Sequence, residues 1–516
     1  MPSRAHPLPP DTCVLGIDLG AGSLKTCVVD SRGRELGSAS RAYATRSPQP
    51  GWSEQDPHDW WRALCDAVPG ALHAADVRPD QVGSVSFSGG AHTPVLLDAA
   101  GSVLRPAILW SDQRSGEEAT ELRGQHEAAI LRTALNCPSP TWTLPQLMWL
   151  RRHEPGIAAA TRRLMVAKDW IRWRLCGAWH TDVTDAVGTM LWDHHESRWS
   201  EWLCDLADWD PATLPPVVQP ASVVGEVTAA AAAECGLVAG TPVVCGTSDT
   251  SAEAYGAGAD VHGAGVLKLA TAATVSIVDE CPHIHPTLLN YPFAIPGLWY
   301  TISATNSCAS AHRWLRDQFF MRDGDDGGAV FAEMDRLAGE APAGSAGLLF
   351  HPYLLGERAP HWDPQLRADF VGFTMRHDRR HFVRALYEGI AFSLRDVLEQ
   401  FRDQGLELRE GRIIGGGARS ALWRQIVADV LQLRVVLPER SDASFGAALL
   451  AGVGIGLFPN ERAAAHLNRG ERAVHEPDPA LAGRYADLFG LYRESKVALT
   501  RINYRLGAFE RGDSSA

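Results

Sequence analysis

Two stretches that lie far apart in the sequence share one plan, in which a β-strand, a turn of small residues and a second β-strand follow one another. The first spans residues 14–30 with its turn at 20–23, and the second spans residues 264–278 with its turn at 271–273. Short apolar runs separated by glycine and other small residues are typical of hairpins. Because a plan that recurs within one chain indicates a duplicated architecture, the sequence predicts two similar α/β domains.

The length of the chain also requires more than one domain. Hydrophobic cores stop growing at about 250 to 300 residues, and this chain has 516 residues. We expect one domain at residues 10–255, a second at 256–505 and a flexible tail at 506–516. A ligand-binding cleft is expected between the two domains.

Composition excludes several classes of protein. The chain has 48 basic and 61 acidic residues and a net charge of −13, which disfavours binding to nucleic acid or to an anionic membrane. Its ten cysteines form no Cys-x-x-Cys pair, which argues against a disulfide framework or a zinc site. The start of the chain does not resemble a secretory signal, and no apolar run approaches membrane-spanning length. We therefore expect a cytoplasmic protein that acts on small molecules.

Asp249 is the candidate catalytic base. It follows a short apolar run that ends at Gly246, and a helix is predicted to begin at this carboxylate. A carboxylate held within hydrogen-bond reach of a bound hydroxyl group can accept its proton during a reaction. The segment therefore predicts general-base chemistry.

The turn at Gly20, Gly22 and Ser23 is a candidate phosphate site. Glycine lets backbone N–H groups approach an anion without a Cβ in the way. Asp18, at the end of the first strand, could hold a metal-bound water that faces this anion. An ordinary hairpin with a partly exposed aspartate is an equally good interpretation. In the second hairpin, Thr271 is the corresponding phosphate candidate.

A third glycine-rich segment lies near the C-terminus. A β-like pair of isoleucines precedes Gly415, Gly416 and Gly417, and a helical pattern follows at residues 421–431. Such a unit admits a flat ring or a phosphate close to the backbone. A Rossmann dinucleotide site is the competing hypothesis, but the triplet lacks the Gly-x-Gly-x-x-Gly spacing. Together with the hairpins, this segment favours a kinase.

Trp52 and His92 are candidates for ligand binding. A helix should begin at Pro57, capped by Asp56, and Trp52 before this cap could reach a cleft. His92 follows a predicted strand at residues 82–88 and lies beside glycines, which suits a hydroxyl-binding group. A lone histidine is more often structural.

Two further segments carry charged residues in the sequence. Asp112 and Arg114 are two positions apart, so they either act on a polyhydroxylated ligand or pair with each other. Lys168 and Asp169 open a helical pattern that ends near Gly177. We predict that this helix packs against the sheet.

Taken in order, these segments resemble the FGGY carbohydrate kinases, and most closely the branch that phosphorylates xylulose. The likeness covers roughly residues 14–458. The motifs that carry it are Gly-Ile-Asp-Leu-Gly from Gly16, Gly-Trp-Ser-Glu-Gln-Asp-Pro from Gly51, Pro-Ala-Ile-Leu-Trp-Ser-Asp-Gln-Arg from Pro106, Lys-Asp-Trp from Lys168, Thr-Asp-Val-Thr-Asp-Ala-Val-Gly-Thr from Thr181, Pro-Tyr-Leu-Leu-Gly-Glu-Arg-Ala-Pro-His from Pro352 and Gly-Gly-Gly-Ala-Arg-Ser-Ala-Leu-Trp-Arg-Gln from Gly415.

The resemblance implies two actin-like or hexokinase-like α/β domains with a ribonuclease-H-like fold around an interdomain cleft that binds a sugar and Mg-ATP. It implies that Asp249 is the base and that Asp18 and Asp249 support Mg²⁺. The residues that it implies for the sugar are Trp52, Ala91, His92, Asp249 and Thr250. Those that it implies for the nucleotide are Gly20, Gly22, Ser23, Lys25, Thr271, Gly415, Gly416, Gly417 and Ala418.

The chain departs from the family pattern at several candidate contacts. Where the family usually has Ser-Gly-Gln-Met-His-Gly, Gly90 and Ala91 replace a long amide and a thioether. A lost hydroxyl contact costs about 1 kcal/mol if water does not replace it. The substrate therefore stays open between D-xylulose and another sugar or polyol, such as a ribulose, a deoxyketose or a pentitol. The other departures are Ala21 for a threonine, Ala270 and Ala272 for a glycine and a serine, and Gln146 for a lysine.

Three hypotheses from different classes follow from the sequence. The first is an ATP-dependent sugar kinase that feeds sugar catabolism. The second is a sugar- and nucleotide-binding pseudokinase. The third is an actin-like or chaperone-like ATPase with protein partners, although the sequence contains no peptide-binding domain. The oligomeric state stays open between a monomer and a homodimer.

Overall fold

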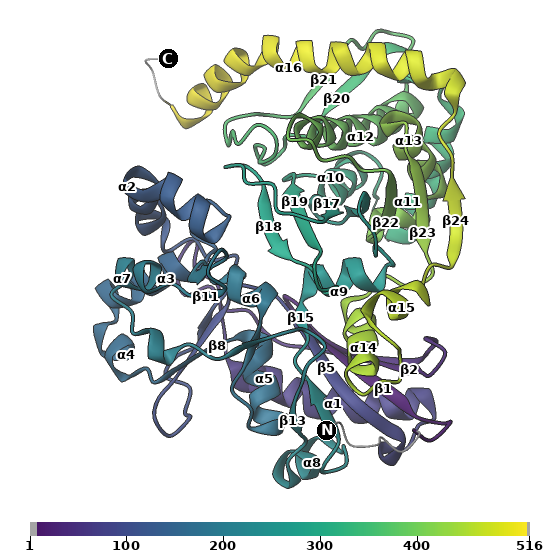
Figure 1. Ribbon diagram of the computed structural model, residues 1–516. Coiled ribbons are helices and arrows are strands. Elements are labelled where there is room, and N and C mark those ends of the chain that lie inside the picture. Colours follow the sequence, from purple (N-terminus) through teal and green to yellow (C-terminus); the bar gives the residue numbers. More distant parts are fainter. Residues whose placement is uncertain (1–7, 323, 513–516) are drawn as a thin grey trace. The chain divides into compact units, whose positions relative to one another are not determined.

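The computed structural model describes residues 8–322 and 324–512 of the chain (Figure 1). Its residues form two compact units. The first unit comprises Met1–Asp260, Glu280–Tyr300 and Arg440–Gly470, and the second comprises Val261–Asp279, Thr301–Glu439 and Glu471–Ala516. The two predicted domains were contiguous stretches of sequence, whereas these units are not.

The first unit is built on a seven-stranded sheet with the order β13-β14-β5-β1-β2-β3 and with β15 also paired to β5. Strands β1 (Cys13–Leu19) and β2 (Ser23–Asp30) form the predicted hairpin, in which Asp18 lies opposite Lys25. Strand β5 (Val82–Gly89) runs parallel to β1, and β15 (Thr247–Ser248) runs parallel to β5. The carboxyl ends of β1, β5 and β15 therefore meet at one edge of the sheet.

The first unit also contains the other strands of this sheet, together with helices and short strands outside it. They are β3 (Glu35–Ala42), β4 (Glu54–Gln55), α1 (Pro57–Ala75), β6 (Pro94–Leu97), β7 (Ala107–Ile108), α2 (Gly116–Ala134), α3 (Thr143–His153), α4 (Pro155–Ala160), β8 (Arg163–Val166), α5 (Ala167–Cys176), β9 (Thr181–Asp182), α6 (Val183–Gly188), β10 (Trp192–Asp193), β11 (Arg198–Trp199), α7 (Glu201–Leu206), β12 (Val217–Val218), β13 (Val223–Glu226), α8 (Ala229–Cys235), β14 (Pro242–Val244), α9 (Asp249–Gly256), β18 (Leu289–Pro292), α14 (Ala443–Gly454) and α15 (Glu461–His466).

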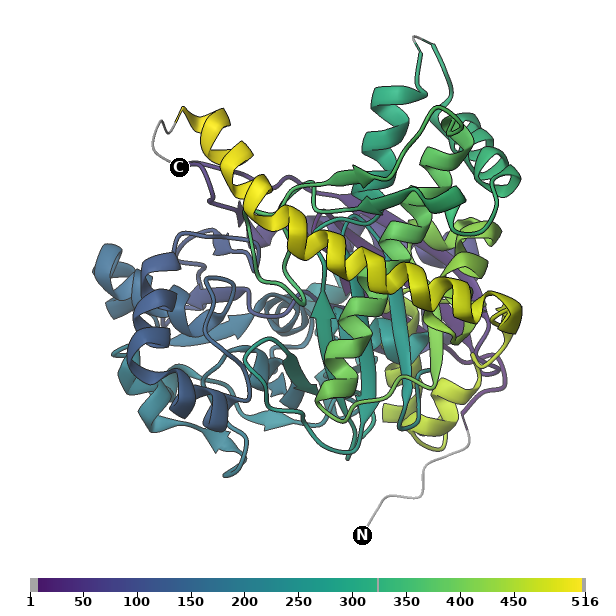
Figure 2. The same cartoon turned by 90° about the horizontal axis from the view of Figure 1, so that it is seen from above.

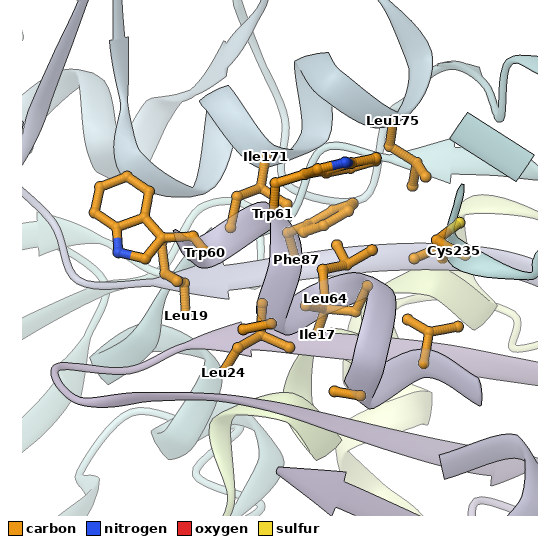
Figure 3. Close-up of a cluster of buried hydrophobic side chains, with 14 of the residues drawn as sticks. Ile17, Leu19, Leu24, Trp60, Trp61, Leu64, Phe87, Ile171, Leu175 and Cys235 are labelled. Atoms are coloured by element: carbon orange, nitrogen blue, oxygen red, sulfur yellow. The ribbon is translucent and has the colours of Figure 1, made fainter. Parts of the chain in front are cut away.

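The hydrophobic core of the first unit joins the sheet to α1 and α5. Helix α1 begins at Pro57, and Asp56 caps it by accepting a hydrogen bond from the backbone N–H of His58. This start was predicted from the sequence and is confirmed. Figure 3 shows Trp61 and Leu64 of this helix among side chains of the sheet and of α5. The buried residues labelled there are Ile17, Leu19, Leu24, Trp60, Trp61, Leu64, Phe87, Ile171, Leu175 and Cys235.

The second unit repeats the plan of the first. Strands β16 (Ala264–Leu269) and β17 (Ala273–Asp279) form the second predicted hairpin. Next to β16 lie β22 (Glu410–Ile414) and β23 (Arg434–Pro438), both parallel, and then the antiparallel β24 (Glu471–His475). The order β17-β16-β22-β23-β24 matches β2-β1-β5-β14-β13 in the direction of every pair, although β13 precedes β14 in the chain whereas β24 follows β23. The predicted duplication is confirmed.

Helices cover the sheet of the second unit, and the longest buried one is α12 (Arg379–Asp403). The apolar face of this helix is buried at Leu386, Ile390 and Leu394. The other elements are α10 (Ala309–Phe319), α11 (Gly327–Glu340), β20 (Leu349–His351), β21 (Asp369–Val371) and α13 (Ala421–Leu431), together with β19 (Trp299–Ala304), which begins in the first unit and ends in the second.

The C-terminal helix α16 (Ala482–Arg511) lies along the second unit (Figure 2). Its Tyr485 and Tyr492 are buried, and the Tyr485 hydroxyl donates a hydrogen bond of 2.8 Å to Glu388 of α12. Because α16 extends to Arg511, residues 506–511 are helical, whereas the sequence predicts that they belong to a flexible tail. The last part of that predicted tail, residues 513–516, lies outside the described residues.

Two expectations about composition can be compared with the structure. All ten cysteines are free thiols, as predicted. In the part of the chain that the structure describes, no helix combines the length and the apolar character needed to cross a lipid bilayer.

Candidate active site

Three segments of the first unit bring predicted site residues to one sheet edge. Asp18 lies near the end of β1, opposite Ser88 of the parallel strand β5. Residues 90–92 follow β5 directly, and Asp249 follows β15, whose Ser248 lies opposite Gly89. The predicted base, the predicted metal ligand and His92 thus come from segments that are distant in sequence and adjacent in the sheet.

Gly246 makes the approach of β15 to β5 possible. Its φ of 83° lies in the left-handed region, and a Cβ at this position would stand 1.9 Å from the backbone oxygen of Phe87. Only glycine fits a backbone that passes so close to another strand. The apolar run that ends in glycine, noted in the sequence, is therefore the feature that brings Asp249 to the sheet edge.

Carboxylates gather at this edge. Asp18 accepts a hydrogen bond of 2.8 Å from Ser88 Oγ, and Asp249 Oδ1 accepts one of 2.6 Å from the backbone N–H of Thr250. Burial, followed by the negative charges of Asp249 and Asp442, raises the pKa of Asp18 to about 8. Oxygen ligands are what Mg²⁺ prefers, and a divalent cation would remove the repulsion that raises this pKa. The donor set therefore fits the Mg²⁺ that the family resemblance implies.

In the turn of the first hairpin, two backbone carbonyl groups accept hydrogen bonds from side chains. The carbonyl of Gly20 accepts a hydrogen bond from the Tyr43 hydroxyl, and the carbonyl of Ala21 accepts one of 2.8 Å from Gln55 Nε2. In a trans peptide the C=O and N–H groups point in opposite directions. The N–H groups of Ala21 and Gly22 consequently point away from these donors, as an anion site requires.

Lys25, another predicted nucleotide contact, is paired within the first unit. Its Nζ lies 2.5 Å from Asp442 Oδ2, and both side chains are more than one third exposed. Asp442 is also the N-cap of α14, where it accepts a hydrogen bond of 3.0 Å from the backbone N–H of Ser444. The sequence analysis did not identify Asp442. A capping residue before a helix was its only local signal.

His92 is held by protein contacts. Its ring stacks on Trp142 with 4.1 Å between centroids, and its Nε2 lies 3.0 Å from the Tyr291 hydroxyl. Burial lowers the pKa of His92 to about 4, against a weaker effect of a hydrogen bond to the backbone of Thr141, so the ring is neutral at pH 7. Trp142 and Tyr291 were missed in the sequence because each is far from His92 along the chain. A contact of His92 with sugar stays a prediction.

The same aromatic group reaches the segment that carries Asp249. Tyr291 stacks on Tyr300 with 5.2 Å between ring centroids. The Tyr300 hydroxyl lies 3.2 Å from Ser248 Oγ, and Ser248 is the N-cap of α9. The rings of Trp142, His92, Tyr291 and Tyr300 thus form a buried aromatic wall in the first unit.

Trp52 lies in a separate cluster. The Arg114 guanidinium lies 3.7 Å from the centroid of the Trp52 ring. Arg114 also pairs with Asp112 through two hydrogen bonds of 2.9 and 2.8 Å, so the structure supports the pairing hypothesis for these two residues.

The changed residues Ala21 and Gly90 border a small cavity in the first unit. Its volume is about 20 Å³, which is room for about one water-sized group. A Cβ on Gly90 would lie 3.4 Å from the Trp110 ring. The residues around the cavity include Leu19, Gly20, Ala21, Gly90, Thr93 and Trp110. Ala91 follows Gly90 in the chain and lies beside Gly188, where a Cβ would stand 3.5 Å from its methyl group.

The second unit contains the turn at Thr271. The carbonyl of Ala270 accepts a hydrogen bond of 2.8 Å from the N–H of Ala309, and the carbonyl of Thr271 accepts one of 3.0 Å from Cys308. As in the first hairpin, the N–H groups of Thr271 and Ala272 point away from these donors. Arg313 of α10, which the sequence analysis missed, donates a hydrogen bond of 3.1 Å to Thr271 Oγ1.

The glycine triplet lies against the end of β16 in the second unit. Gly415 has a φ of 88°, and a Cβ there would stand 2.7 Å from the backbone oxygen of Leu269. A Cβ on Gly417 would meet Leu269 and Trp423, whereas one on Gly416 would meet nothing within 4 Å. Gly416 therefore has open space beside it, and Gly417 and Ala418 are buried.

Comparison with known proteins agrees with this architecture. Residues 13–256 match the N-terminal domain of the FGGY family of carbohydrate kinases, and residues 266–455 match its C-terminal domain. A xylulose kinase of Bacillus subtilis (strain 168) is 30% identical over 501 residues, which cover 96% of this chain and 99% of that protein. A xylulose kinase of Escherichia coli (strain K12) is 32% identical over 443 residues, which cover 85% and 89%.

A solved structure gives the same result. The crystal structure of xylulose kinase from Rhodospirillum rubrum superposes on this chain with a TM-score of 0.87. The two sequences are 31% identical, and the match covers 95% of this chain and 100% of that chain. The duplicated α/β plan and its carboxylate-lined sheet edge define a phosphotransferase with an actin-like ATPase fold. The chain belongs to the FGGY family of carbohydrate kinases, which transfer a phosphoryl group to an alcohol.

Proposed function

We propose that this protein transfers the γ-phosphate of ATP, in the presence of Mg²⁺, to a hydroxyl group of a ketopentose such as D-xylulose. The observation that carries the proposal is the position of Asp249, which follows β15 at the sheet edge where the Asp18 carboxyl also lies. The xylulose kinases that are similar over nearly the whole chain support the substrate class.

In this proposal Asp249 is the general base. A sugar hydroxyl is a poor nucleophile at neutral pH, so its proton passes to the Asp249 carboxylate while its oxygen bonds to the γ-phosphorus. The bond from that phosphorus to the bridging oxygen of the β-phosphate breaks, and ADP leaves. Asp18 and Asp249 would hold Mg²⁺, which would supply positive charge that stabilises the phosphate oxygens. The N–H groups of the two hairpin turns bind phosphate oxygens.

Nucleotide and sugar contacts complete the proposal. We assign the adenosine to the segment from Gly415 to Ala418, where Gly416 leaves open space beside the backbone. The sugar lies beside Asp249 and Thr250. Trp52 and His92 already have protein partners. Their contacts with the sugar therefore stay predictions. A cytoplasmic location also stays a prediction.

A coupled assay that follows ADP production tests the reaction. We expect ADP release to depend on one sugar, and Asp249→Asn to lower kcat by at least about 100-fold because it removes the base. The dissociation constant for ATP should stay within a few-fold of the wild-type value. Glu253→Gln, on the same helix, removes the same charge and serves as the control. Turnover of Asp249→Asn close to that of the wild type contradicts the proposal, and sugar binding without transfer of label from γ-labelled ATP favours a pseudokinase.

The substrate is best identified with a panel of ketopentoses, deoxyketoses and pentitols. The cavity beside Gly90 has room for one methyl-sized group, so a substrate with an apolar substituent is the alternative to D-xylulose. The double variant Gly90→Gln, Ala91→Met restores the amide and thioether side chains of the family pattern and removes the space beside Gly90. If D-xylulose is phosphorylated equally well by the wild type and by the double variant, the open wall does not set specificity.

A further inference from the structure

A cluster of charged side chains is completely buried in the first unit, behind the segment that carries Asp249. Lys168 Nζ lies 2.7 Å from Asp169 Oδ1, 2.8 Å from Asp182 Oδ1 and 2.9 Å from Asp185 Oδ2. Arg172 Nη1 lies 2.8 Å from the same oxygen of Asp169. None of these five side chains is more than 1% exposed. We call these residues the buried ion cluster.

The charges of the buried ion cluster are close to balance. Two cations face three carboxylates, and burial raises the pKa of Asp185, with the neighbouring Asp182 and Asp169 adding to the effect against Lys168. A protonated Asp185 leaves two carboxylates for two cations. Removing five such groups from water is expensive, and well-packed apolar side chains usually stabilise a fold at least as well. Stability alone therefore does not account for the buried ion cluster.

The buried ion cluster contacts the segment that precedes Asp249 at two points, once at Cys245 before β15 and once at Thr247 within β15. Arg172 Nη1 donates a hydrogen bond of 3.0 Å to the carbonyl of Cys245. Thr247 Oγ1 lies 3.2 Å from Asp182 Oδ2 and 3.0 Å from Thr184 Oγ1. Thr247 itself is completely buried, so its hydroxyl has no access to water as a replacement partner.

Strand β15 needs such anchors because it is short. It consists of Thr247 and Ser248 alone, and it pairs with β5 at only two positions. Ser248 makes no side-chain cap for α9, since its Oγ contacts the Tyr300 hydroxyl instead. The direction in which Asp249 leaves the sheet is therefore set by whatever fixes β15.

We propose that the buried ion cluster, acting through the Thr247 hydroxyl, positions Asp249 for proton transfer. Thr247 is thus a positioning residue and makes no contact with the substrate. The inference rests on the proposed function, in which Asp249 is the base. A displacement of about 1 Å can lower a rate about 100-fold, so losing one anchor of β15 should reduce turnover while ligand binding is kept.

The test compares Thr247→Val, which keeps the shape and removes the hydroxyl, with Thr247→Ser, which keeps the hydroxyl. Thr247→Val is expected to lower kcat by about 10-fold or more, with the dissociation constants for ATP and sugar within about threefold. Thr247→Ser should recover most of the lost turnover. Thr228→Val, which removes the hydroxyl that caps α8, is the control outside the network and should keep kcat within about twofold.

A second measurement does not depend on activity. Amide hydrogen exchange of the segment 245–256 should be faster in Thr247→Val than in the wild type and normal in Thr247→Ser. Asp182→Asn, which keeps the shape at the other end of the contact, replaces Thr247→Val if that variant does not fold. Unchanged kcat or unchanged exchange in a folded variant overturns the inference. If the wild type phosphorylates no sugar, the proposed function fails and the role of Asp249 in proton transfer fails with it. The exchange result then decides only whether the Thr247 hydroxyl anchors β15.

Discussion

The two hairpin turns share one backbone arrangement but differ in the groups that surround it. In both, carbonyl groups accept hydrogen bonds from the protein and the following N–H groups point the other way. In the first unit the donors are side chains, Tyr43 and Gln55, whereas in the second they are backbone amides at the start of α10. A shared backbone shape therefore does not require shared side chains.

The difference in charge is more informative. Asp18 stands two positions before Gly20 in the first turn, and Lys268 stands two positions before Ala270 in the second. Asp18 lies opposite Ser88 of β5, and Lys268 lies opposite Ile414 of β22. The first turn thus has an acidic neighbour suited to a cation, and the second has Lys268 and Arg313, suited to an anion. The two hairpins therefore differ in the charge that lies beside the turn.

The largest effect is expected when the negative charge of Asp18, beside the first turn, is removed. Asp18→Asn should lower kcat by about 1,000-fold, since charge neutralisation by the metal contributes several kcal/mol to phosphoryl transfer. The requirement for Mg²⁺ should also rise. Asp442→Asn is the matched control, because Asp442 is already paired with Lys25, and it should cost less than about 10-fold. Equal losses in the two variants, measured as kcat against Mg²⁺ concentration, would contradict the special role of Asp18.

The next effect concerns a buried carboxyl in the second unit. Burial raises the pKa of Glu357 to about 7, against an ordinary value near 4.5. The folded protein therefore binds this proton more tightly than the unfolded chain does, so the stabilisation is complete below about pH 4.5 and is lost as the pH rises to about 7. The free energy of unfolding should fall by up to about 3 kcal/mol across this range.

Glu357→Gln isolates this contribution. The variant keeps an oxygen that can accept the hydrogen bonds from the backbone N–H groups of Asn306 and Arg358, but it cannot titrate. Denaturant unfolding at pH 5 and pH 7.5 should give a smaller decrease for the variant than for the wild type. Parallel pH profiles would show that Glu357 does not carry this dependence.

A smaller effect is expected when Arg313, beside the second turn, is replaced. Arg313→Ala should weaken ATP binding by about 10-fold or more, because a hydrogen bond to a charged group contributes about 1.5 to 3 kcal/mol. Adenosine, which lacks phosphates, should bind the variant and the wild type equally in calorimetry. Arg316→Ala is the control, since Arg316 lies on the same helix and pairs with Asp317. A loss that is equal for ATP and adenosine would place Arg313 outside the phosphate site.

The smallest effect should come from restoring a lost hydroxyl group. Ala272→Ser places a hydroxyl beside the turn at Thr271 and should improve the affinity for ATP by at most about fivefold, in line with about 1 kcal/mol for one hydrogen bond. Ala21→Thr does the same for the first turn. Isothermal titration with ATP measures both. If neither variant gains affinity, these positions do not contact the nucleotide.

Sequence reasoning predicted the local elements of this site and missed their long-range partners. The hairpins, the capped start of α1 and the glycine turn at Gly415 were identified because each depends on residues within a few positions. Asp442 was missed because its partner Lys25 lies 417 residues away in the sequence. Arg313 was missed for the same reason, since nothing in the sequence places α10 beside Thr271.

The sequence by itself therefore determined the family, the duplicated plan and the identity of the candidate base, because these are written in short motifs and their order. Only the tertiary structure decided which charges face one another. Lys168 and Asp169 were predicted simply to open a helix, and the fold placed them against Asp182 and Asp185, behind Asp249. Electrostatic interactions depend on distance in space and on burial, and neither quantity can be read from positions along a chain.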